Sequence, residues 1–404
     1  MDNTEKEVLV IGGGIGGVAA ALASAEAGHK TKILEQAPVF GEIGAGIQMG
    51  PNAMAVLDRF GVADEIEKYA VFPQRLVLKD VYTAKELAAL DLGDEFKAKF
   101  GFPYIVLHRS DLHRVLVEAA EKNPLISLVN DQIIETVDQN ESGVIVTNQS
   151  GEQFSGKAAI GADGLWSKTR KYFADDEAIC SHYVAYRGTV PIEEISTDAN
   201  MDDVIMWIGP NLHVVQYPVR KGELYNQVVV FKSQQYKPDS DEWGTPEEMD
   251  AVFKGCHPLV EKALSFIQRQ IRWPMYDREP IGNWTKGNFT LLGDAAHPML
   301  QYLAQGGCQA LEDASYLADM LQLHGENFEQ AFLAYQKERI PRTAKVQKSA
   351  RTWGEIIHAE DPVSILLRDT LLENIEAKDF DMIDWLYGYE KLPAANNKQA
   401  GISL

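Results

Sequence analysis

The stretch Glu7-Val-Leu-Val-Ile-Gly-Gly-Gly-Ile-Gly-Gly-Val18 decides the fold of the first part of this chain. Its opening residues form a short apolar run, which is typical of a buried parallel strand. Gly12, Gly14 and Gly17 follow at the spacing G-x-G-x-x-G, and an Ala-rich segment continues to Ala27. We therefore expect a strand, a tight turn and a helix in that order, as in dinucleotide-binding folds.

Each glycine of this motif has a physical reason. Gly12 permits the tight turn, Gly14 lets the backbone approach a pyrophosphate, and Gly17 allows close packing of helix on strand. The helix N-terminus offers free N–H groups and a positive dipole end to the phosphates. A second strand, 31–34, ends in Glu35, 18 residues after Gly17, where a carboxylate can accept both hydroxyls of an adenosine ribose. An acid there argues against a 2′-phosphate but leaves NAD and FAD open.

The composition indicates a globular enzyme that does not bind nucleic acid. The chain has 404 residues, a net charge of −21 and 45% hydrophobic residues, so binding driven by phosphate contacts is disfavoured. Three well-separated cysteines, Cys180, Cys256 and Cys308, show neither a disulfide framework nor metal spacing. No histidine pair suggests a metal site. With no apolar run of membrane-spanning length and no apolar leader, we expect a cytoplasmic protein without a membrane span.

The pattern along the chain alternates between α/β and β-rich segments. The strand-then-acid pattern recurs at Asp163 and Asp294, whereas 181–231 predicts an antiparallel sheet. From 309 onward the pattern is almost entirely helical. The expected helices are 18–27, 53–69, one beginning near Ser110 as N-cap, 246–268, 310–321, 328–338 and 342–357.

Two further motifs indicate a family. Gly161-Ala-Asp-Gly-x-x-Ser-x-x-Arg170 and Gly293-Asp-Ala-Ala-His-Pro298 resemble the second and third fingerprints of the para-hydroxybenzoate hydroxylase class of single-component FAD monooxygenases. The resemblance covers roughly residues 5–350. It implies an α/β fold in which a Rossmann-like FAD-binding domain is interleaved with an antiparallel β-sheet substrate domain, followed by C-terminal helices that often contribute to a homodimer. The implied segments are 1–72, 99–178 and 283–340 for the FAD-binding domain, 73–98 and 179–282 for the substrate domain, and 341–404 for the C-terminal helical region.

The resemblance also implies roles for cofactor-binding residues. Glu35 should hold the AMP ribose, Arg109 the pyrophosphate region, and Asp294 the ribityl chain or pyrophosphate of FAD. Asp163 lies in the segment that the family uses near FAD and the reductant, although capping of a helix beginning at Leu165 is an equal alternative.

Gly307 belongs to a loop and helix start that resemble those facing the isoalloxazine. No second dinucleotide fingerprint is present. This agrees with a nicotinamide coenzyme that binds only transiently, expected to be NADH with NADPH not excluded.

Three residues are candidates for catalysis and substrate binding. His213 and Tyr217 share one face of a predicted strand, and a histidine there could accept the proton of a phenol. Each also has an ordinary alternative, a buried histidine bonded to a carbonyl and a tyrosine packed in the sheet. At Gln301 many relatives have proline, and an amide there resembles 3-hydroxybenzoate 6-hydroxylases. Tyr104 is a further substrate-binding candidate, with core packing equally plausible.

We therefore expect an FAD-dependent monooxygenase that uses NAD(P)H and O2 to hydroxylate a monohydroxybenzoate. The resemblance implies attack by a flavin C4a-hydroperoxide, with 3-hydroxybenzoate converted to 2,5-dihydroxybenzoate by para hydroxylation. A salicylate or hydroxypyridine-carboxylate hydroxylase is the enzymatic alternative. A dinucleotide-binding protein without turnover is the alternative from another class.

Overall fold

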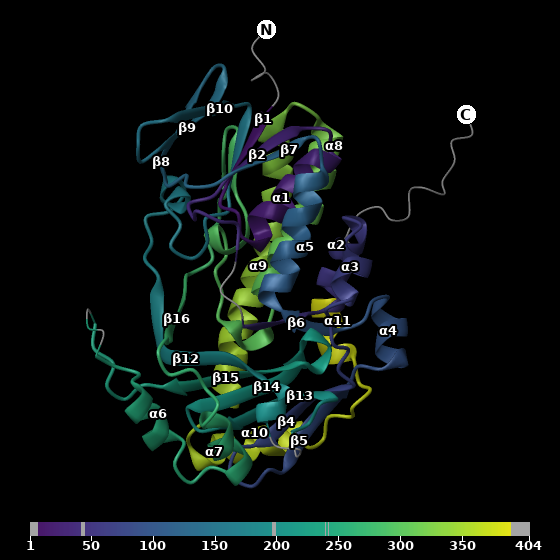
Figure 1. Cartoon of the computed structure of the whole chain (residues 1–404), viewed down its shortest axis with the longest axis vertical. Coiled ribbons are helices and arrows are strands. Elements are labelled where there is room, and N and C mark those ends of the chain that lie inside the picture. Colours follow the sequence, from purple (N-terminus) through teal and green to yellow (C-terminus); the bar gives the residue numbers. More distant parts are fainter. Residues whose placement is uncertain (1–6, 42–44, 196–198, 239, 241, 389–404) are drawn as a thin grey trace.

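The computed structural model describes residues 7–41, 45–195, 199–238, 240 and 242–388. Two sheets lie at opposite ends of the molecule, and the long helix α9 (Phe328–Ile357) runs from one to the other (Figure 1). This arrangement confirms the expected α/β fold with a second, β-rich part and C-terminal helices. The six segment boundaries stay predictions.

The upper sheet in Figure 1 has six strands, and all its neighbouring pairs are parallel except β17–β18. Its order is β17 (Thr285–Lys286), β18 (Phe289–Leu291), β11 (Ala158–Gly161), β1 (Glu7–Ile11), β2 (Lys30–Leu34) and β7 (Ile126–Val129). Because the carboxyl ends of parallel strands meet at one edge, Gly12, Glu35, Asp163 and Asp294 all follow strands at the same edge.

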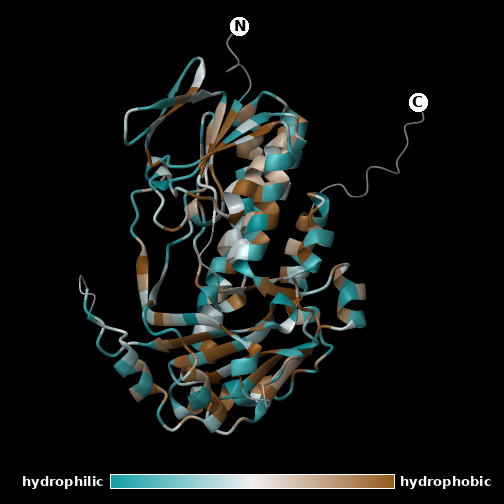
Figure 2. Ribbon diagram, in the orientation of Figure 1, coloured by the Kyte–Doolittle hydropathy of each residue, from teal (hydrophilic) through white to brown (hydrophobic). Residues whose placement is uncertain are grey.

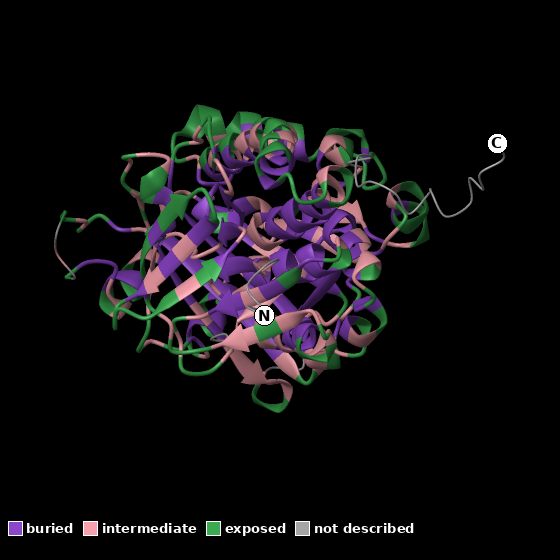
Figure 3. Ribbon diagram, turned by 90° about the horizontal axis from the view of Figure 1, so that it is seen from above, coloured by how far each residue is buried: buried purple, intermediate pink, exposed green. Residues whose placement is uncertain are grey.

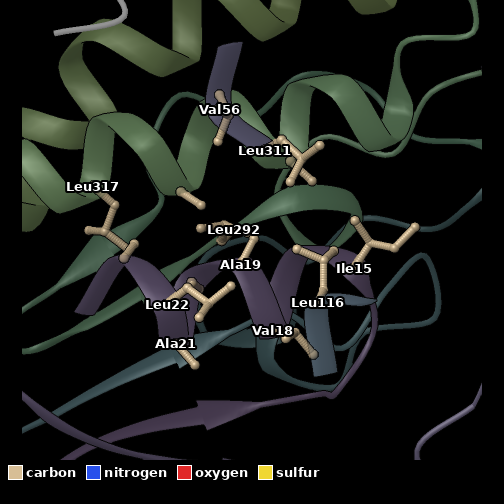
Figure 4. Close-up of a cluster of buried hydrophobic side chains, with 14 of the residues drawn as sticks. Ile15, Val18, Ala19, Ala21, Leu22, Val56, Leu116, Leu292, Leu311 and Leu317 are labelled. Carbon is tan, nitrogen blue, oxygen red and sulfur yellow. The ribbon is translucent and has the colours of Figure 1, made fainter. Parts of the chain in front are cut away.

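Helix α1 (Ile15–Glu26) packs between this sheet and two other helices, α5 (Arg109–Lys122) and α8 (Gly306–His324). Figure 4 shows apolar side chains of α1, α5 and α8 meeting in one cluster. Gly17 makes the close approach possible, because a Cβ there would lie 1.9 Å from the carbonyl oxygen of Gly12. Gly12 itself has φ +104°, a conformation that favours glycine. The expected reasons for these two glycines are therefore confirmed.

The lower sheet has seven strands, which are brown along much of their length in Figure 2. Its order is β16 (Trp273–Asp277), β12 (Ile179–Pro191), β15 (Leu224–Lys232), β14 (Leu212–Val219), β13 (Asp203–Gly209), β4 (Arg75–Asp80) and β5 (Glu86–Asp91). It is antiparallel as expected, except that β4, contributed by an earlier part of the chain, pairs with β13 in parallel. One face packs against α6 (Pro246–Val252) and α7 (Pro258–Leu264). The other face is turned toward the upper half of the molecule (Figure 1).

The remaining elements surround or lie between these two sheets. A small antiparallel sheet contains β8 (Ile134–Asn140), β9 (Gly143–Asn148) and β10 (Gln153–Gly156), and β3 (Gly46–Met49) pairs with β6 (Ile105–His108). The other α-helices are α2 (Pro51–Arg59), α3 (Ala63–Glu67), α4 (Asp94–Phe100), α10 (Pro362–Leu372) and α11 (Asp381–Tyr387). Short 3-10 helices are η1 (Thr169–Tyr172), η2 (Ile192–Glu194), η3 (Arg220–Gly222), η4 (Gly293–Ala295) and η5 (Gln301–Leu303).

Two expected helices are each split in the structure. The segment 53–69 forms α2 and α3, because Gly61 at φ +70° ends the first helix. The segment 246–268 forms α6 and α7, because Gly255 adopts φ +86° and Pro258 begins a new helix. Glycine and proline residues cause both breaks, although apolar residues continue at helical spacing through each break.

Two other expectations about helix ends were wrong. Residues 328–338 and 342–357 form one helix, α9, with Pro341 inside it. Proline removes one helical hydrogen bond, but tertiary contacts of Arg339 and Arg342 on either side hold the helix together. Helix α5 begins at Arg109, and the hydroxyl of Ser110 hydrogen-bonds the Nδ1 atom of His108 at 2.6 Å instead of capping the helix.

Burial follows the layered arrangement, with buried segments inside and exposed helix faces around them (Figure 3). The three cysteines are free. Among the described residues, no helix combines the length and apolar character needed to cross a membrane. The last sixteen positions of the expected C-terminal region, 389–404, lie outside the described residues.

A buried ionic network joins α8 to α9. Arg339 lies 2.7 Å from Glu312 and 2.7 Å from Asp313, and Arg342 lies 3.0 Å from Glu312. All four side chains are almost completely shielded from solvent. Because two cations face two carboxylates there, the charges are compensated within the protein.

We expect Arg339→Met to destabilise the fold by about 3–5 kcal/mol, because it leaves the buried Asp313 without its arginine partner and Glu312 with Arg342 alone. The matched control is Arg114→Met, which breaks a surface pair with Glu118 and should cost less than about 1 kcal/mol. Denaturant-induced unfolding followed by circular dichroism measures both. Equal midpoints for the two variants would contradict a structural role for the network.

Candidate active site

The edge of the six-stranded sheet carries features that suit an anionic dinucleotide. Helices α1 and α8 both begin without a side-chain cap and without an acid in their first turn. Their terminal N–H groups and positive dipole ends are therefore suited to phosphate. The carboxylate of Glu35 accepts hydrogen bonds from the backbone N–H of Gly13 at 2.5 Å and of Ala37 at 2.8 Å. A carboxylate has about four acceptor positions, so it can accept ribose hydroxyls as well.

Asp294 lies at the same edge, in the turn η4 that follows β18. The residue is exposed to solvent. The protein that surrounds its carboxylate nevertheless displaces part of the hydrating water, and this raises the pKa of Asp294. We attribute this combination to a carboxylate on the wall of a recess, and the positive charge of Arg109 nearby opposes the pKa increase. A Cβ added to Gly306 would meet only an Asp294 oxygen, at 3.8 Å. A polar ligand can therefore approach the start of α8 at this point.

Gly307, beside Gly306, faces β3 instead. A Cβ there would contact the side chains of Met49 and Ile47 at 3.3 and 3.4 Å. The start of α8 therefore lies against β3, which belongs to the segment 41–52. The role of Gly307 at the isoalloxazine stays a prediction.

Asp163 is occupied by local hydrogen bonds. It accepts from the hydroxyls of Ser167 and Thr169 at 2.6 and 2.5 Å, and from the backbone N–H groups of Lys168 and Thr169 at 2.8 and 3.0 Å. These bonds support the capping alternative, but the helix is η1 and starts at Thr169. The expected start at Leu165 was wrong, because Gly164 adopts φ +77° and turns the chain first.

One face of the seven-stranded sheet carries the candidate substrate residues. His213, Val215 and Tyr217 alternate along β14 and share this face, as expected. Val215 of β14 pairs with Val228 of the neighbouring strand β15. Val228 pairs on its other side with Arg187 of β12. Residues directly opposite in a sheet lie on the same face. Arg187 therefore stands in the row between His213 and Tyr217, about 10 Å across the sheet from β14.

Arg187 contacts Gln301 directly. Its Nη2 atom donates a hydrogen bond to Oε1 of Gln301, and its guanidinium lies 5.8 Å from the centre of the Trp273 ring. Burial and the like charge of Arg109 lower the pKa of Arg187. In the described part of the chain, no carboxylate pairs with Arg187, and its Nε atom is buried without a hydrogen-bond partner. Such a cation is suited to binding an anionic ligand.

The Arg187 contact also fixes the orientation of the Gln301 amide. Arginine has only donors, so the atom that accepts from it is the amide oxygen. The amide nitrogen of Gln301 is then left as a donor, and it points toward the sulfur of Met275 at 4.0 Å. Gln301 therefore acts as a donor at this site, whereas the sequence left both roles open.

Tyr104 and Tyr217 meet through a third residue, Gln48 of β3. The hydroxyl of Tyr104 donates to Oε1 of Gln48 at 2.6 Å, and Gln48 also lies close enough to Tyr217 to oppose the increase in its pKa. Burial raises the pKa of both phenols, so both stay protonated. Gly46 makes this contact possible, because a Cβ there would lie 2.5 Å from the Tyr217 ring. Strand β3 thus packs against the seven-stranded sheet.

His213 is paired with a residue that the sequence analysis did not select. Its Nδ1 atom lies 2.7 Å from Nε2 of His358, the residue that ends α9. The ring of Tyr302, next to Gln301 in sequence, lies 5.7 Å from the ring of His213. The partner of the His213 Nδ1 atom is therefore a histidine side chain, whereas the ordinary alternative for this residue is a bond to a backbone carbonyl.

Sequence reasoning missed Arg187, Gln48 and His358. Arg187 carried a usable signal, because it is a cation inside the expected strand 183–190 and shares a face with small or apolar residues. Gln48 and His358 carried none, since each lies more than 100 residues from the side chain that it meets in the lower sheet.

Comparison with known proteins identifies the family. A model of the FAD binding domain family matches residues 5–350. The chain is 39% identical to a 3-hydroxybenzoate 6-hydroxylase of Polaromonas naphthalenivorans (strain CJ2), over 95% of this chain and 96% of that protein. It is 32% identical to a 6-hydroxynicotinate 3-monooxygenase of Bordetella bronchiseptica, over 86% and 91% of the two chains.

Solved structures show the same fold. Klebsiella pneumoniae HpxO complexed with FAD and uric acid has a TM-score of 0.83 at 22% identity, covering 96% of this chain and 98% of that one. A salicylate hydroxylase substrate complex has a TM-score of 0.79 at 24% identity, covering 96% of both chains. The FAD prediction is confirmed by the family match, and the residues at the sheet edge fit that cofactor. The chain belongs to the FAD binding domain family, in the class of FAD-dependent aromatic monooxygenases.

Proposed function

We propose that this enzyme hydroxylates 3-hydroxybenzoate para to its hydroxyl group, giving 2,5-dihydroxybenzoate with NADH and O2. Relatives named 3-hydroxybenzoate 6-hydroxylase, at 36–39% identity, support this substrate. Position 6 of that ring is para to the hydroxyl on carbon 3, so the name implies the same product.

The observation that carries the proposal is the half-buried Arg187–Gln301 pair, whose arginine lies on the same sheet face as His213. A hydroxybenzoate has one carboxylate and one hydroxyl, and this sheet face offers one unpaired guanidinium together with an amide donor and a histidine. We assign the carboxylate to Arg187, because a bidentate guanidinium contact neutralises both charges in a buried site. The hydroxyl oxygen then lies at Gln301 and His213.

Activation of the ring depends on loss of the phenolic proton. A free phenol titrates near pH 10, about the Tyr reference, so the site must favour the phenolate. The amide N–H of Gln301 stabilises the negative oxygen by donating to it, and His213 accepts the proton. Tyr217, which burial keeps protonated, orients the ring as a donor at its edge, whereas the hydroxyl of Tyr104 donates to Gln48 and holds that side chain in place.

The cofactor is held at the other side of the site. Glu35 is assigned to the ribose, the starts of α1 and α8 with Arg109 to the pyrophosphate, and Asp294 to the ribityl chain. The chemistry that FAD supplies when bound is acceptance of a hydride and activation of O2. The protein itself binds the aromatic ring, excludes water and accepts the phenolic proton of the substrate. The transient coenzyme is assigned as NADH.

We also infer that the enzyme is a homodimer. An apolar stripe on α10 is exposed in the single chain, which supports a partner surface there. Its residues recur at helical spacing: Val363, Leu366, Leu367 and Leu371.

A substrate screen tests the proposed activity. Hydroxybenzoates and hydroxypyridine carboxylates are supplied separately to the FAD-loaded enzyme, and NADH oxidation is followed with product analysis by chromatography. 3-Hydroxybenzoate should give the largest stimulation and 2,5-dihydroxybenzoate as product. Preference for salicylate or 6-hydroxynicotinate would replace the proposed substrate, and no stimulation by any compound would reject turnover.

Glu35→Arg should weaken FAD binding roughly 10- to 150-fold, because it replaces a ribose acceptor by a cation, and one charged hydrogen bond contributes about 1.5–3 kcal/mol. Fluorescence titration of the apoprotein with FAD measures the affinity. Glu7→Arg, at the opposite end of β1 from the cofactor edge, is the matched control and should bind FAD normally. Normal affinity in Glu35→Arg would remove Glu35 from the cofactor site.

Arg187→Met should weaken 3-hydroxybenzoate binding by a similar 10- to 150-fold, because the carboxylate loses its charged partner. Binding of the neutral analogue 3-hydroxybenzamide should change little. The measurement is the shift of the flavin absorbance on titration with each ligand. Equal losses for acid and amide would show that Arg187 does not recognise the carboxylate.

Gln301→Met should lower the yield of hydroxylated product per NADH while FAD stays bound, because methionine keeps the size but cannot donate to the phenolate. Gln301→Glu should in addition weaken substrate binding, since its carboxylate would pair with Arg187. Product and hydrogen peroxide are quantified against NADH consumed. Unchanged coupling in the methionine variant would make Gln301 a spectator.

A further inference from the structure

His213 and His358 form a buried pair at the inner face of the seven-stranded sheet. The two nitrogens lie 2.7 Å apart, and the ring centres are 5.0 Å apart with planes inclined by 25°. His213 is 2% exposed and His358 is 4% exposed. The pair joins a strand of the substrate sheet to the end of α9, 145 positions later in the chain.

The hydrogen bond restricts the tautomers of the two rings. A neutral imidazole has one N–H donor and one acceptor nitrogen. If Nδ1 of His213 carries the hydrogen and donates to Nε2 of His358, then Nε2 of His213 is an acceptor. In that arrangement His213 is ready to receive a proton, and Nδ1 of His358 carries the hydrogen at the far end.

The surroundings disfavour a lasting positive charge on either ring. Burial, followed by the neighbouring histidine, lowers the pKa of His213 well below its usual value. Burial, followed by the cations Arg368 and Lys232, lowers the pKa of His358 to about 3. The other groups that face the pair are the rings of Tyr183 and Tyr302, which are neutral. A proton accepted by His213 must therefore be passed on.

We propose that His358 is the second member of a proton relay that carries the substrate's phenolic proton from His213 toward the surface. This inference rests on the proposed function. The O–H bond of the phenol breaks as an N–H bond forms at Nε2 of His213. The Nδ1–H bond of His213 breaks as one forms at Nε2 of His358. The Nδ1–H bond of His358 breaks last and its proton goes to water. The electron pair of the phenolic O–H bond stays on oxygen.

The end of α9 provides the outlet. His358 is followed by half-buried Ala359 and exposed Glu360, so solvent lies within two residues of the pair. The backbone N–H of Asn211 donates to the carbonyl of His358 at 3.1 Å, and the Tyr183 ring stacks on His358 at 4.5 Å. These contacts hold the His358 ring in place behind His213.

The test is His358→Gln in the FAD-loaded enzyme, with 3-hydroxybenzoate as the probe. Glutamine keeps a hydrogen-bonding group but cannot relay a proton as imidazole does. Stopped-flow mixing with a pH indicator dye measures proton release on binding, and peroxide analysis measures coupling. We expect release slower by about 10-fold or more, within the usual effect of a proton-transfer group, and peroxide in place of product. Release and coupling at wild-type level would overturn the proposal.

Tyr183→Phe is the matched control, because it keeps the ring stacked on His358 and removes only the hydroxyl. It should release the proton at the wild-type rate, and an equal loss in this variant would overturn the relay in favour of packing. Stimulation of NADH oxidation in the wild type tests the proposed function separately. Failure of the relay and failure of the substrate assignment are thus distinguished.

A measurement on the unmodified enzyme covers the case in which His358→Gln does not fold or retain FAD. The rate of phenol deprotonation is followed by ultraviolet absorbance in mixtures of H2O and D2O. Protons moving together through both histidines should give a curved dependence on the deuterium fraction. A linear dependence would indicate transfer of a single proton and would overturn the relay.

Discussion

The compensated charges between α8 and α9 constrain the rest of the site. Arg339 lies against Glu312 and Asp313 in a region without solvent, where either charge alone would be strongly unfavourable. Asp313 also accepts from the backbone N–H of Gly293 at 3.0 Å and lies 2.6 Å from His297. The network therefore fixes the turn that presents Asp294, and it anchors α9 against the cofactor half.

Helix α9 transmits this constraint to the substrate sheet. It starts beside the six-stranded sheet and ends at Ile357 (Figure 1), and the next residue, His358, contacts His213 of β14. Gly354 on this helix lets the Tyr302 ring pack against it, since a Cβ there would lie 2.4 Å from the ring. Tyr302 follows Gln301 directly, so one helix positions both the amide and the histidine pair. The relative placement of cofactor and substrate groups thus depends on a single rigid element.

The charged side chains of the site suit the binding of anionic ligands. Two cations, Arg109 and Arg187, influence one another, and Arg109 also lies near the carboxylate of Asp294. A cation such as Arg187, which pairs with no carboxylate among the described residues, is a local feature that suits an anionic ligand in a chain of net charge −21. Burial disfavours the charged forms of the histidine and tyrosine on the same sheet face, so His213 stays neutral and Tyr217 stays protonated.

The sequence by itself determined the dinucleotide-binding edge, the β-rich second part and the family, because strand, turn and acid are local in the chain. It also placed His213 and Tyr217 on one face, since strand periodicity is local. Only the tertiary structure decided that Asp163 caps η1, that α9 continues through Pro341, and which way the Gln301 amide points. His358 and Gln48 joined the site through contacts between distant segments. Such contacts depend on how sheets and helices pack, which no local pattern of residues encodes.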